Sequence, residues 1–317
     1  MNNNPKISIA IPTYNGGDYI KLQLKRFVNE TNNIKFKNFF EIIISDNAST
    51  DNTKTIINNF LNNNYKNTTI KYYRQKKNLG YYENFISAIK KTRGEYLLTL
   101  VDHDVPQKGF YLQLLAKFKN KNYKNLIFLP FEKVKPYKKK IFGLNKLGYV
   151  VERGSSMSGI ILKKKELSLK YIEKSLYVQN IIFVDYFLKF GMKQLRLKSR
   201  IKKIGTAESV TDKFNDRVNR GDDYATSDKL KSIEIFYNNK KINFLEYFIT
   251  IYKIYTWCLE IKWNLKELKR HDLEKKYFYT LLKNKRKIIS VIFLFIFLKN
   301  IFNKKKFFYL DAFLKSI

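Results

Sequence analysis

The sequence predicts an α/β fold built on a mostly parallel central sheet, followed by a helical C-terminal region. Mainly apolar, β-branched runs recur along the first hundred residues, as at Ile7–Pro12 and Glu41–Ser45. Each of these runs ends in a polar loop, and each loop leads into a stretch with helical spacing. A third run, Tyr96–Val101, carries no charge, as expected for a strand buried on both faces. Alternating strands and helices are typical of a parallel sheet.

The first two strands each precede an amphipathic helix. Pro12 ends the first strand, and a turn-rich loop leads to a helix whose predicted buried stripe is Leu22, Leu24, Phe27 and Val28. The second strand ends in Asp46–Thr53, where a side chain such as Ser49 can cap the next helix.

A third strand, Ile70–Arg74, precedes a loop ending at Gly80 and a further helix, after which the chain enters the uncharged run. Polar loops at Thr13–Asp18, Asp46–Asp51 and Asp102–Asp104 therefore follow strands of one sheet. Because carboxyl ends of parallel strands meet at one edge, we expect these loops to converge there on a ligand.

Asp102 and Asp104 end the uncharged run, separated by His103. Two carboxylates at the mouth of a crevice suit a divalent cation that also holds phosphate oxygens. The alternative is an acidic turn that caps the next helix. The position of the pair on the shared edge favours a metal site, with His103 as a spacer that faces away.

Composition restricts the possible partners. The chain has 62 Lys and Arg against 27 Asp and Glu, a net charge of +35, which favours anionic partners. Part of the Lys excess fits the biased codon use of an A+T-rich genome, because Asn, Ile, Phe and Tyr are also abundant. A single Cys258 excludes an intramolecular disulfide. The N-terminus has no signal-peptide pattern, so we expect a cytoplasmic protein.

Residues 5–110 resemble the nucleotide-sugar half of family 2 glycosyltransferases, which have the GT-A fold, a Rossmann-like nucleotide-binding domain. The resemblance is strongest to bacterial members that build capsular and lipooligosaccharide chains. It is carried by Ile9–Asn15, Ser45–Asp51, the Asn78-Leu79-Gly80 turn with Asn84, and the Asp102-x-Asp104 pair.

The resemblance implies a donor-binding site for a nucleotide-diphosphate sugar with Mg²⁺ or Mn²⁺. Pro12, Thr13, Tyr14 and Asn15 would line the base and ribose pocket, Asp46 would bind the base, Asn78, Gly80 and Asn84 would border the sugar phosphate, Asp102 would lie near the ribose, and Asp104 would hold the metal. From the residues alone, Asp46 could instead cap a helix, and Asn84 could be a polar residue on a helix face.

The general base of the family is expected in the acceptor half, residues 111–205. The small-residue segment Arg153–Leu162 resembles the one that opens the acceptor side, although any loop could need such residues. Asp185 is the only carboxylate in Tyr177–Gly191 and is the candidate base, because an unpaired carboxylate in an apolar helix is costly. On a helix, the side chains of Asp185 and Gln179 point in directions roughly 120° apart, so both cannot face one cleft squarely.

The remaining chain divides into two segments. Residues 206–228 are polar and predict either a lid, with Arg217 or Arg220 binding the pyrophosphate, or a solvated linker. Residues 229–317 have helical spacing with a stripe that includes Phe244, Tyr247 and Ile251. The apolar tail Ile288–Leu298 is flanked by Lys and is too short to span a bilayer, which takes ~20 residues. It predicts a helix lying on an anionic membrane surface, or one packed on the catalytic domain.

These observations predict a glycosyltransferase that moves a sugar to a hydroxyl of a bacterial surface glycan, with inversion expected from the family resemblance. Two other classes compete with this interpretation. A sugar-nucleotide nucleotidyltransferase uses a related sheet, but normally has a glycine-rich basic loop after its first strand. A basic nucleic-acid-binding protein fits the charge, but the sequence contains no base-reading module and its charge is spread along the chain.

Overall fold

The computed structural model describes residues 4–62, 69–131, 145–155, 157–172, 178–204, 224–247, 249–251 and 254. The chain divides into two compact units, Met1–Ile141 with Tyr149–Thr206, and Phe142–Gly148 with Ala207–Ile317. We treat each unit by itself.

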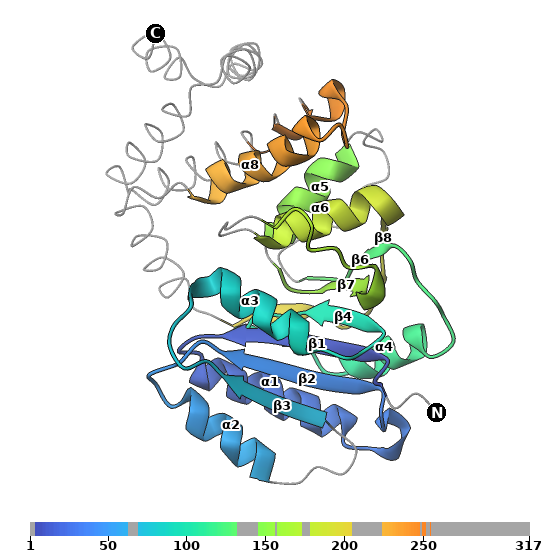
Figure 1. Ribbon diagram of the computed structural model, residues 1–317. Helices are drawn as coiled ribbons and strands as arrows, with labels where there is room; N and C mark the ends of the chain where they lie inside the picture. Colours follow the sequence, from blue (N-terminus) through green and yellow to red (C-terminus); the bar gives the residue numbers. More distant parts are fainter. Residues whose placement is uncertain are drawn as a thin grey trace, which may run out of the picture. The chain divides into compact units, whose positions relative to one another are not determined.

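A seven-stranded sheet forms the centre of the first unit (Figure 1), in the order β3-β2-β1-β4-β7-β6-β8. Its strands are β1 (Ile7–Thr13), β2 (Phe40–Asp46), β3 (Thr69–Arg74), β4 (Tyr96–Thr99), β6 (Leu126–Phe128), β7 (Ile160–Lys163) and β8 (Met192–Gln194). Strands β1 to β4 are parallel, and β7 is antiparallel to both of its neighbours. The predicted mostly parallel sheet is therefore confirmed.

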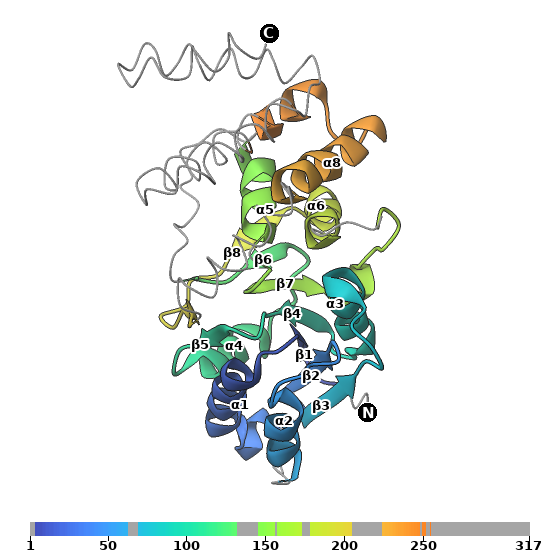
Figure 2. The same cartoon turned by 90° about the vertical axis from the view of Figure 1, so that its left-hand side faces the viewer.

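Helices cover both faces of this sheet. They are α1 (Gly17–Thr31), α2 (Thr53–Asn62), α3 (Gly80–Lys91), α4 (Phe110–Phe118), α5 (Asn145–Ser155) and α6 (Val178–Phe190), with short 3-10 turns at Ile34–Phe36 and Lys164–Glu166. Figure 2 shows α1 and α2 on one side of the sheet and α3 on the other. The main core lies on the α1 side, where side chains such as Leu24 and Phe27 pack against Ile9 and Leu98.

The predicted stripe of α1 needs one correction. Leu24, Phe27 and Val28 are buried, whereas Leu22 is 43% exposed. Leu22 is two residues before Leu24, and on a 3.6-residue period two steps turn the side chain by roughly 200°, away from the core. The position that completes the buried stripe is Ile20, which is four residues before Leu24.

A second, two-stranded sheet lies beside the edge of the large sheet at which the polar loops follow the strands. It pairs β5 (Asp104–Pro106) with β9 (Ile201–Lys203) in antiparallel register, so that Asp104 is opposite Lys203. Asp104 therefore ends the third polar loop and also begins a strand. The segment that fixes its position, β9, lies almost one hundred residues later in the sequence.

The second unit contains α8 (Tyr224–Asn238), which begins five residues before the predicted start of the helical region. In the predicted stripe, Tyr247 and Ile251 are buried, but Phe244 is exposed. The ring of Tyr247 stacks on that of Tyr237 with centroids 4.4 Å apart. The tail Ile288–Leu298 lies outside the described residues.

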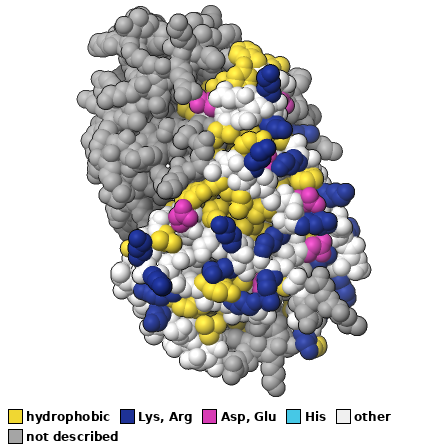
Figure 3. Space-filling model, in the orientation of Figure 1, with side chains coloured by type: hydrophobic (Ala, Val, Ile, Leu, Met, Phe, Trp, Pro, Cys, Tyr) yellow, Lys and Arg dark blue, Asp and Glu magenta, His cyan; other side chains and the backbone are white. Residues whose placement is uncertain are grey.

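No helix in the described part of the chain is both long and apolar enough to cross a membrane. On the face shown in Figure 3, Lys and Arg side chains are spread among hydrophobic and acidic ones instead of being gathered over one element.

Candidate functional site

The carboxyl ends of β1, β2 and β4 bring the three predicted loops together. Thr13 at the end of β1 lies opposite Asp46 at the end of β2. On its other side β1 pairs with β4, and Leu100 N donates to Ala10 O just after the last paired residues. Register alone thus places the loops of residues 13–18, 46–51 and 102–104 next to one another, as the sequence predicts.

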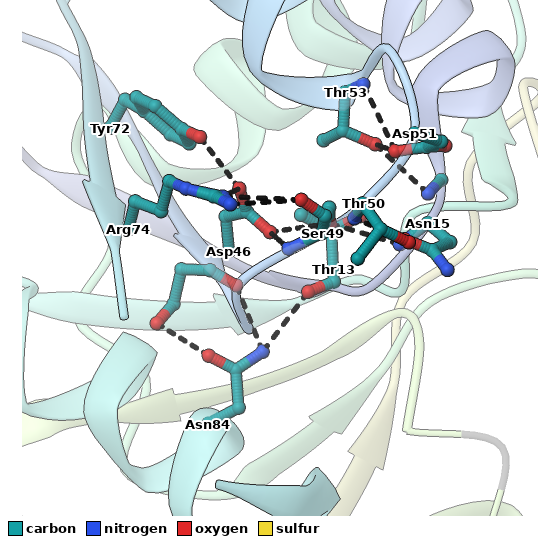
Figure 4. Close-up of polar contacts among 12 residues, drawn as sticks. Thr13, Asn15, Asp46, Ser49, Thr50, Asp51, Thr53, Tyr72, Arg74 and Asn84 are labelled. Carbon is teal, nitrogen blue, oxygen red and sulfur yellow. Dashed lines mark hydrogen bonds and ion pairs between the residues drawn. The ribbon is translucent and has the colours of Figure 1, made fainter. Parts of the chain in front are cut away.

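Asp46 lies at the centre of a polar network between β2 and β3 (Figure 4). Its Oδ1 accepts from the backbone N and Oγ of Ser49, at 2.9 and 2.5 Å. Its Oδ2 accepts from the Tyr72 hydroxyl at 2.6 Å and from Arg74 Nη1 at 3.4 Å. Asp46 is completely buried. The carboxylate thus fixes the start of its own loop, and that role is independent of any ligand.

Two of the residues around Asp46 were not predicted from the sequence. Burial, and secondarily the hydrogen bond to Asp46, raise the pKa of the Tyr72 phenol well above its usual range. Arg74 also donates to the Ser49 carbonyl, at 2.9 Å from Nη2. Both residues are on β3 with one residue between them, so their side chains share a face of the sheet.

The first and second loops are joined by direct hydrogen bonds. Asn15 N donates to Ser49 Oγ at 2.9 Å, and Asn15 Oδ1 accepts from Thr50 N at 2.8 Å. Asn15 is in the left-handed region, with φ of 51°, which an Asn tolerates better than most residues. The neighbouring Tyr14 is 42% exposed, so its ring is available to a ligand.

Asp51 closes the second loop at the start of α2. Its carboxylate accepts from the backbone and hydroxyl of Thr53 and from Gly17 N. Burial pushes the pKa of Asp51 upward, but these hydrogen bonds outweigh burial, so the pKa lies below its ordinary value. Asp51 is therefore the residue that caps α2, which leaves Asp46 free of that role.

The two asparagines predicted near the sugar phosphate have structural contacts. Asn84 is buried in α3, where Nδ2 donates to Ser45 O at 2.9 Å and to Thr13 O at 3.3 Å. It therefore joins the ends of β1 and β2. Asn78 Oδ1 accepts from Asn47 Nδ2 at 2.7 Å and from Gly80 N at 2.9 Å. Asn47, which the sequence did not single out, thus ties the Asn78–Gly80 turn to the second loop.

Asp102 is held on both of its oxygens. Thr13 Oγ1 donates to Oδ2 at 2.8 Å, and His103 Nδ1 lies 2.9 Å from Oδ1. The expectation that His103 faces away is wrong, since it packs beside Asp102 and its ring meets that of Tyr19 edge-on. A Cβ at Gly16 would clash with Asp102 Oδ2. Any residue with a Cβ at this position would therefore displace the Asp102 carboxylate or the Thr13 hydroxyl.

Asp104 is more deeply buried than Asp102. The residue is 2% exposed, whereas the Asp102 side chain is 14% exposed. Its backbone is fixed on both sides, because its N–H donates to Val101 O at 3.2 Å and its carbonyl accepts from Gln23 Nε2 at 2.6 Å. Within the described residues, no group of three or more His, Cys, Asp or Glu could hold a metal. Any cation here would take two carboxylates at most from this part of the chain.

The turn Met157–Gly159 supports the strand that carries this pair. Ser158 Oγ accepts from Val101 N at 2.9 Å, and Gly159 N donates to Thr99 O at 2.9 Å. Met157 and Gly159 have φ of 58° and 75°. The predicted small-residue loop is thus shorter than expected, because Arg153–Ser155 form the end of α5.

Asp185 has a partner, contrary to the premise on which it was selected. Its Oδ2 lies 2.6 Å from Lys189 Nζ, one helical turn later. Residues Val178 to Tyr186 of α6 are buried all round the helix, so Gln179 and Asp185 are both inside despite their different directions. The other predicted phosphate-binding residues, Arg217 and Arg220, lie outside the described residues.

The family match covers just under half of this chain. Residues 8–155 match glycosyl transferase family 2. The abequosyltransferase RfbV of Salmonella typhimurium is 44% identical over 90 residues, which cover 28% of this chain and 26% of that protein. A Campylobacter jejuni protein, GalNAc(5)-diNAcBac-PP-undecaprenol beta-1,3-glucosyltransferase, is 29% identical over 123 residues, covering 36% and 34%. The matched stretches thus span well under half of these relatives.

Solved structures match over a larger part of the chain. S. aureus TarS 1-349 has a TM-score of 0.57 at 14% identity, covering 90% of this chain and 83% of its own. The mannosyltransferase PcManGT of Pyrobaculum calidifontis, solved with GDP-Man and Mn²⁺, has a TM-score of 0.52 at 10% identity, covering 99% and 84%. At these identities the likeness shows the fold. Residues 8–155 thus match glycosyl transferase family 2, and the chain has the GT-A fold.

Proposed function

We propose that the protein transfers a sugar from a nucleotide-diphosphate sugar to a hydroxyl group of a bacterial surface glycan. The convergence of three strand-end loops carries this proposal, because Thr13 joins the first loop to Asp102 and Asn15 joins it to the second. The names of the two relatives, an abequosyltransferase and a glucosyltransferase of an undecaprenol-linked glycan, support a bacterial glycan as the acceptor.

In this proposal the nucleotide lies on the first two loops. Pro12, Thr13, Tyr14 and Asn15 form one wall, with the exposed ring of Tyr14 available for stacking on the base. The opposite wall is the second loop, which Asp46 holds through its hydrogen bond with Ser49. A carboxylate oxygen of Asp46 that still has a free lone pair accepts a hydrogen bond from the base. Asn78, Gly80 and Asn84 border the sugar phosphate, and Arg217 or Arg220 binds the pyrophosphate.

The two aspartates fit a divalent cation. They supply hard oxygen ligands at a sheet edge, and a site with one or two carboxylates completed by substrate phosphates is usual for Mg²⁺. Asp104 would be the direct ligand and Asp102 would stay near the ribose. When bound, the cation neutralises charge that develops on the diphosphate leaving group. The Mn²⁺ in the PcManGT structure supports this choice of cofactor.

We propose that Asp185 is the general base that takes the proton from the acceptor hydroxyl. It is the only carboxylate in the segment where the family resemblance expects the general base, and its ion pair with Lys189 at 2.6 Å fixes its position. Attack by the acceptor on the face opposite the diphosphate would invert the configuration at the anomeric carbon. The protein would work in the cytoplasm, with its C-terminal tail on the inner face of the membrane.

The test is a thermal-shift screen of the full chain against nucleotide diphosphates and nucleotide sugars, with and without Mn²⁺. A cognate donor at about 100 times its Kd should stabilise the protein by about 2.7 kcal/mol. The proposal also requires that the best donor be consumed when a glycan acceptor is added. If no nucleotide stabilises the protein in either condition while DNA does so in a salt-sensitive manner, the proposal is wrong.

A further inference from the structure

Gln23 is a buried amide to which the proposed function gives no role. It lies in α1, next to Leu24 of the apolar stripe, and is 1% exposed. Burying an amide is costly unless its polar atoms are hydrogen-bonded. The hydrogen bonds that Gln23 makes lead directly to the segment that carries the two aspartates.

The Gln23 amide binds both ends of one tight turn. Residues 101–104 form this turn, in which Asp104 N donates to Val101 O at 3.2 Å. Gln23 Nε2 donates to Val101 O at 2.5 Å and to Asp104 O at 2.6 Å. A side-chain amide has two donor protons, so both are used here. One side chain therefore holds the first and the last carbonyl of the turn.

The turn sets the direction of both carboxylates. Asp102 is at its second position and Asp104 at its last, so a change in the turn would move the two carboxylates relative to each other. A second contact comes from Tyr19, one helical turn before Gln23, whose ring meets that of His103 edge-on at 6.2 Å. The same face of α1 thus contacts the turn at two successive levels.

The oxygen of the Gln23 amide is not used in the same way. Oε1 is buried and has no hydrogen-bond partner in the part of the chain that the structure describes. An unsatisfied buried acceptor offsets part of the stability that the two donations provide. Stability alone gives little reason for an amide at this position, and the placement of the turn gives a specific one.

We propose that Gln23 is a positioning residue of the metal site: by holding both ends of the turn, it fixes the Asp102 and Asp104 carboxylates before a cation binds. This inference rests on the proposed function where it takes the pair as the cation site. Groups that orient metal ligands without touching the metal typically change metal affinity about 10–100-fold when they are removed. Loss of Gln23 should therefore weaken the binding steps that need the cation.

The first experiment needs no metal. Gln23→Met removes both donations and keeps the length of the side chain. In hydrogen exchange followed by mass spectrometry, a peptide covering residues 100–106 should exchange at least about tenfold faster than in the wild type. Thr31→Val is the matched control, because it removes another buried hydrogen bond of α1, from Thr31 Oγ1 to Phe27 O at 2.7 Å. This control should leave the exchange of residues 100–106 unchanged.

Two outcomes of the exchange experiment would overturn the proposal. One is unchanged exchange of residues 100–106 in Gln23→Met. The other is faster exchange spread evenly over the whole chain, which would mean that Gln23 contributes only to overall stability.

The second experiment follows donor binding by calorimetry as Mn²⁺ is added. Gln23→Met should need at least about tenfold more Mn²⁺ than the wild type for half-maximal binding of the best nucleotide sugar. Any donor binding that remains without Mn²⁺ should be the same in both proteins. Thr31→Val should stay within about twofold of the wild type in its Mn²⁺ requirement. A wild-type Mn²⁺ requirement in Gln23→Met would contradict the proposal.

A second variant covers the case in which Gln23→Met is insoluble. Gln23→Asn keeps the amide but is one methylene shorter, so it cannot reach both carbonyls, and it should show the same two changes. Wild-type behaviour of Gln23→Asn in both experiments would also overturn the proposal. If no protein binds a donor with Mn²⁺, the proposed function is wrong, while the exchange of residues 100–106 still decides whether Gln23 holds the turn.

Discussion

The network around Asp46 predicts that Asp46 and Tyr72 are energetically coupled. Tyr72→Phe removes one hydrogen bond of 2.6 Å to a fully buried carboxylate. A hydrogen bond to a charged group contributes about 1.5–3 kcal/mol, so we expect a loss of about 2 kcal/mol in the free energy of unfolding.

Asp46→Asn should cost about 2–4 kcal/mol, because the amide retains one acceptor oxygen and places an NH₂ group toward donors. In the double variant, the Tyr72 bond is already absent. The combined loss should therefore be smaller than the sum of the two single losses, by about 1–2 kcal/mol.

Urea unfolding of the four proteins, followed by far-UV circular dichroism, measures this coupling. Tyr73→Phe is a matched control on the same strand, since its side chain points to the opposite face, and it should change stability by no more than about 0.5 kcal/mol. If the losses from Asp46→Asn and Tyr72→Phe add to within about 0.4 kcal/mol, the network does not act as described.

Three further predictions concern the loops and α6. In Gly16→Ala the new Cβ would clash with Asp102 Oδ2 and displace the carboxylate, so Mn²⁺-dependent donor binding should weaken about tenfold in calorimetry. Gly191→Ala is the control. It carries only the backbone strain of φ at 67° after α6 and should leave donor binding unchanged. Asp185→Asn should lower sugar transfer by at least about 100-fold with donor binding intact, and transfer within a few-fold of wild type would reduce Asp185 to the partner of Lys189. Folding lowers the pKa of Asp51, so this residue contributes stability above its unfolded pKa of about 3.9 and loses that contribution as pH falls through the folded pKa. Carbon-13 NMR titration should find the pKa of the Asp51 carboxyl below about 3.9. The wild type should also lose more stability on acidification than Asp51→Asn.

The edge of the sheet could be predicted from the sequence because each of its determinants is local. Strand periodicity, the polar residues that follow each strand, and the direction shared by parallel strands together predict that Thr13, Asp46 and Asp102 lie close to one another. The structure has Thr13 in register with Asp46 and hydrogen-bonded to Asp102.

The partners of Asp46 and Asp104 could not be predicted in the same way. Tyr72 and Arg74 reach Asp46 only because β3 pairs with β2 in one particular register, which the polar pattern of β3 does not specify. Asp104 is fixed by β9, so this contact depends on tertiary structure between segments that are far apart in the sequence.

Two details could have been predicted better from helical spacing. Asp185 and Lys189 are four residues apart on a predicted helix, which is the spacing of a side-chain ion pair. The spacing therefore predicts a partner for Asp185, and its burial alone does not assign it a catalytic role. The choice of Leu22 is a similar case. Residues three or four apart share a face of a helix, and this spacing would have selected Ile20 in its place.

The central claim is that the edge formed by the three loops binds a nucleotide-diphosphate sugar through a cation held by the aspartates. Calorimetry of the best donor with wild type and Asp104→Asn, each with and without Mn²⁺, tests it most directly. We expect donor binding that depends on Mn²⁺ in the wild type and is lost in Asp104→Asn, with the variant still folded. Equal donor binding by the two proteins, or no binding by the wild type in the presence of Mn²⁺, would contradict it.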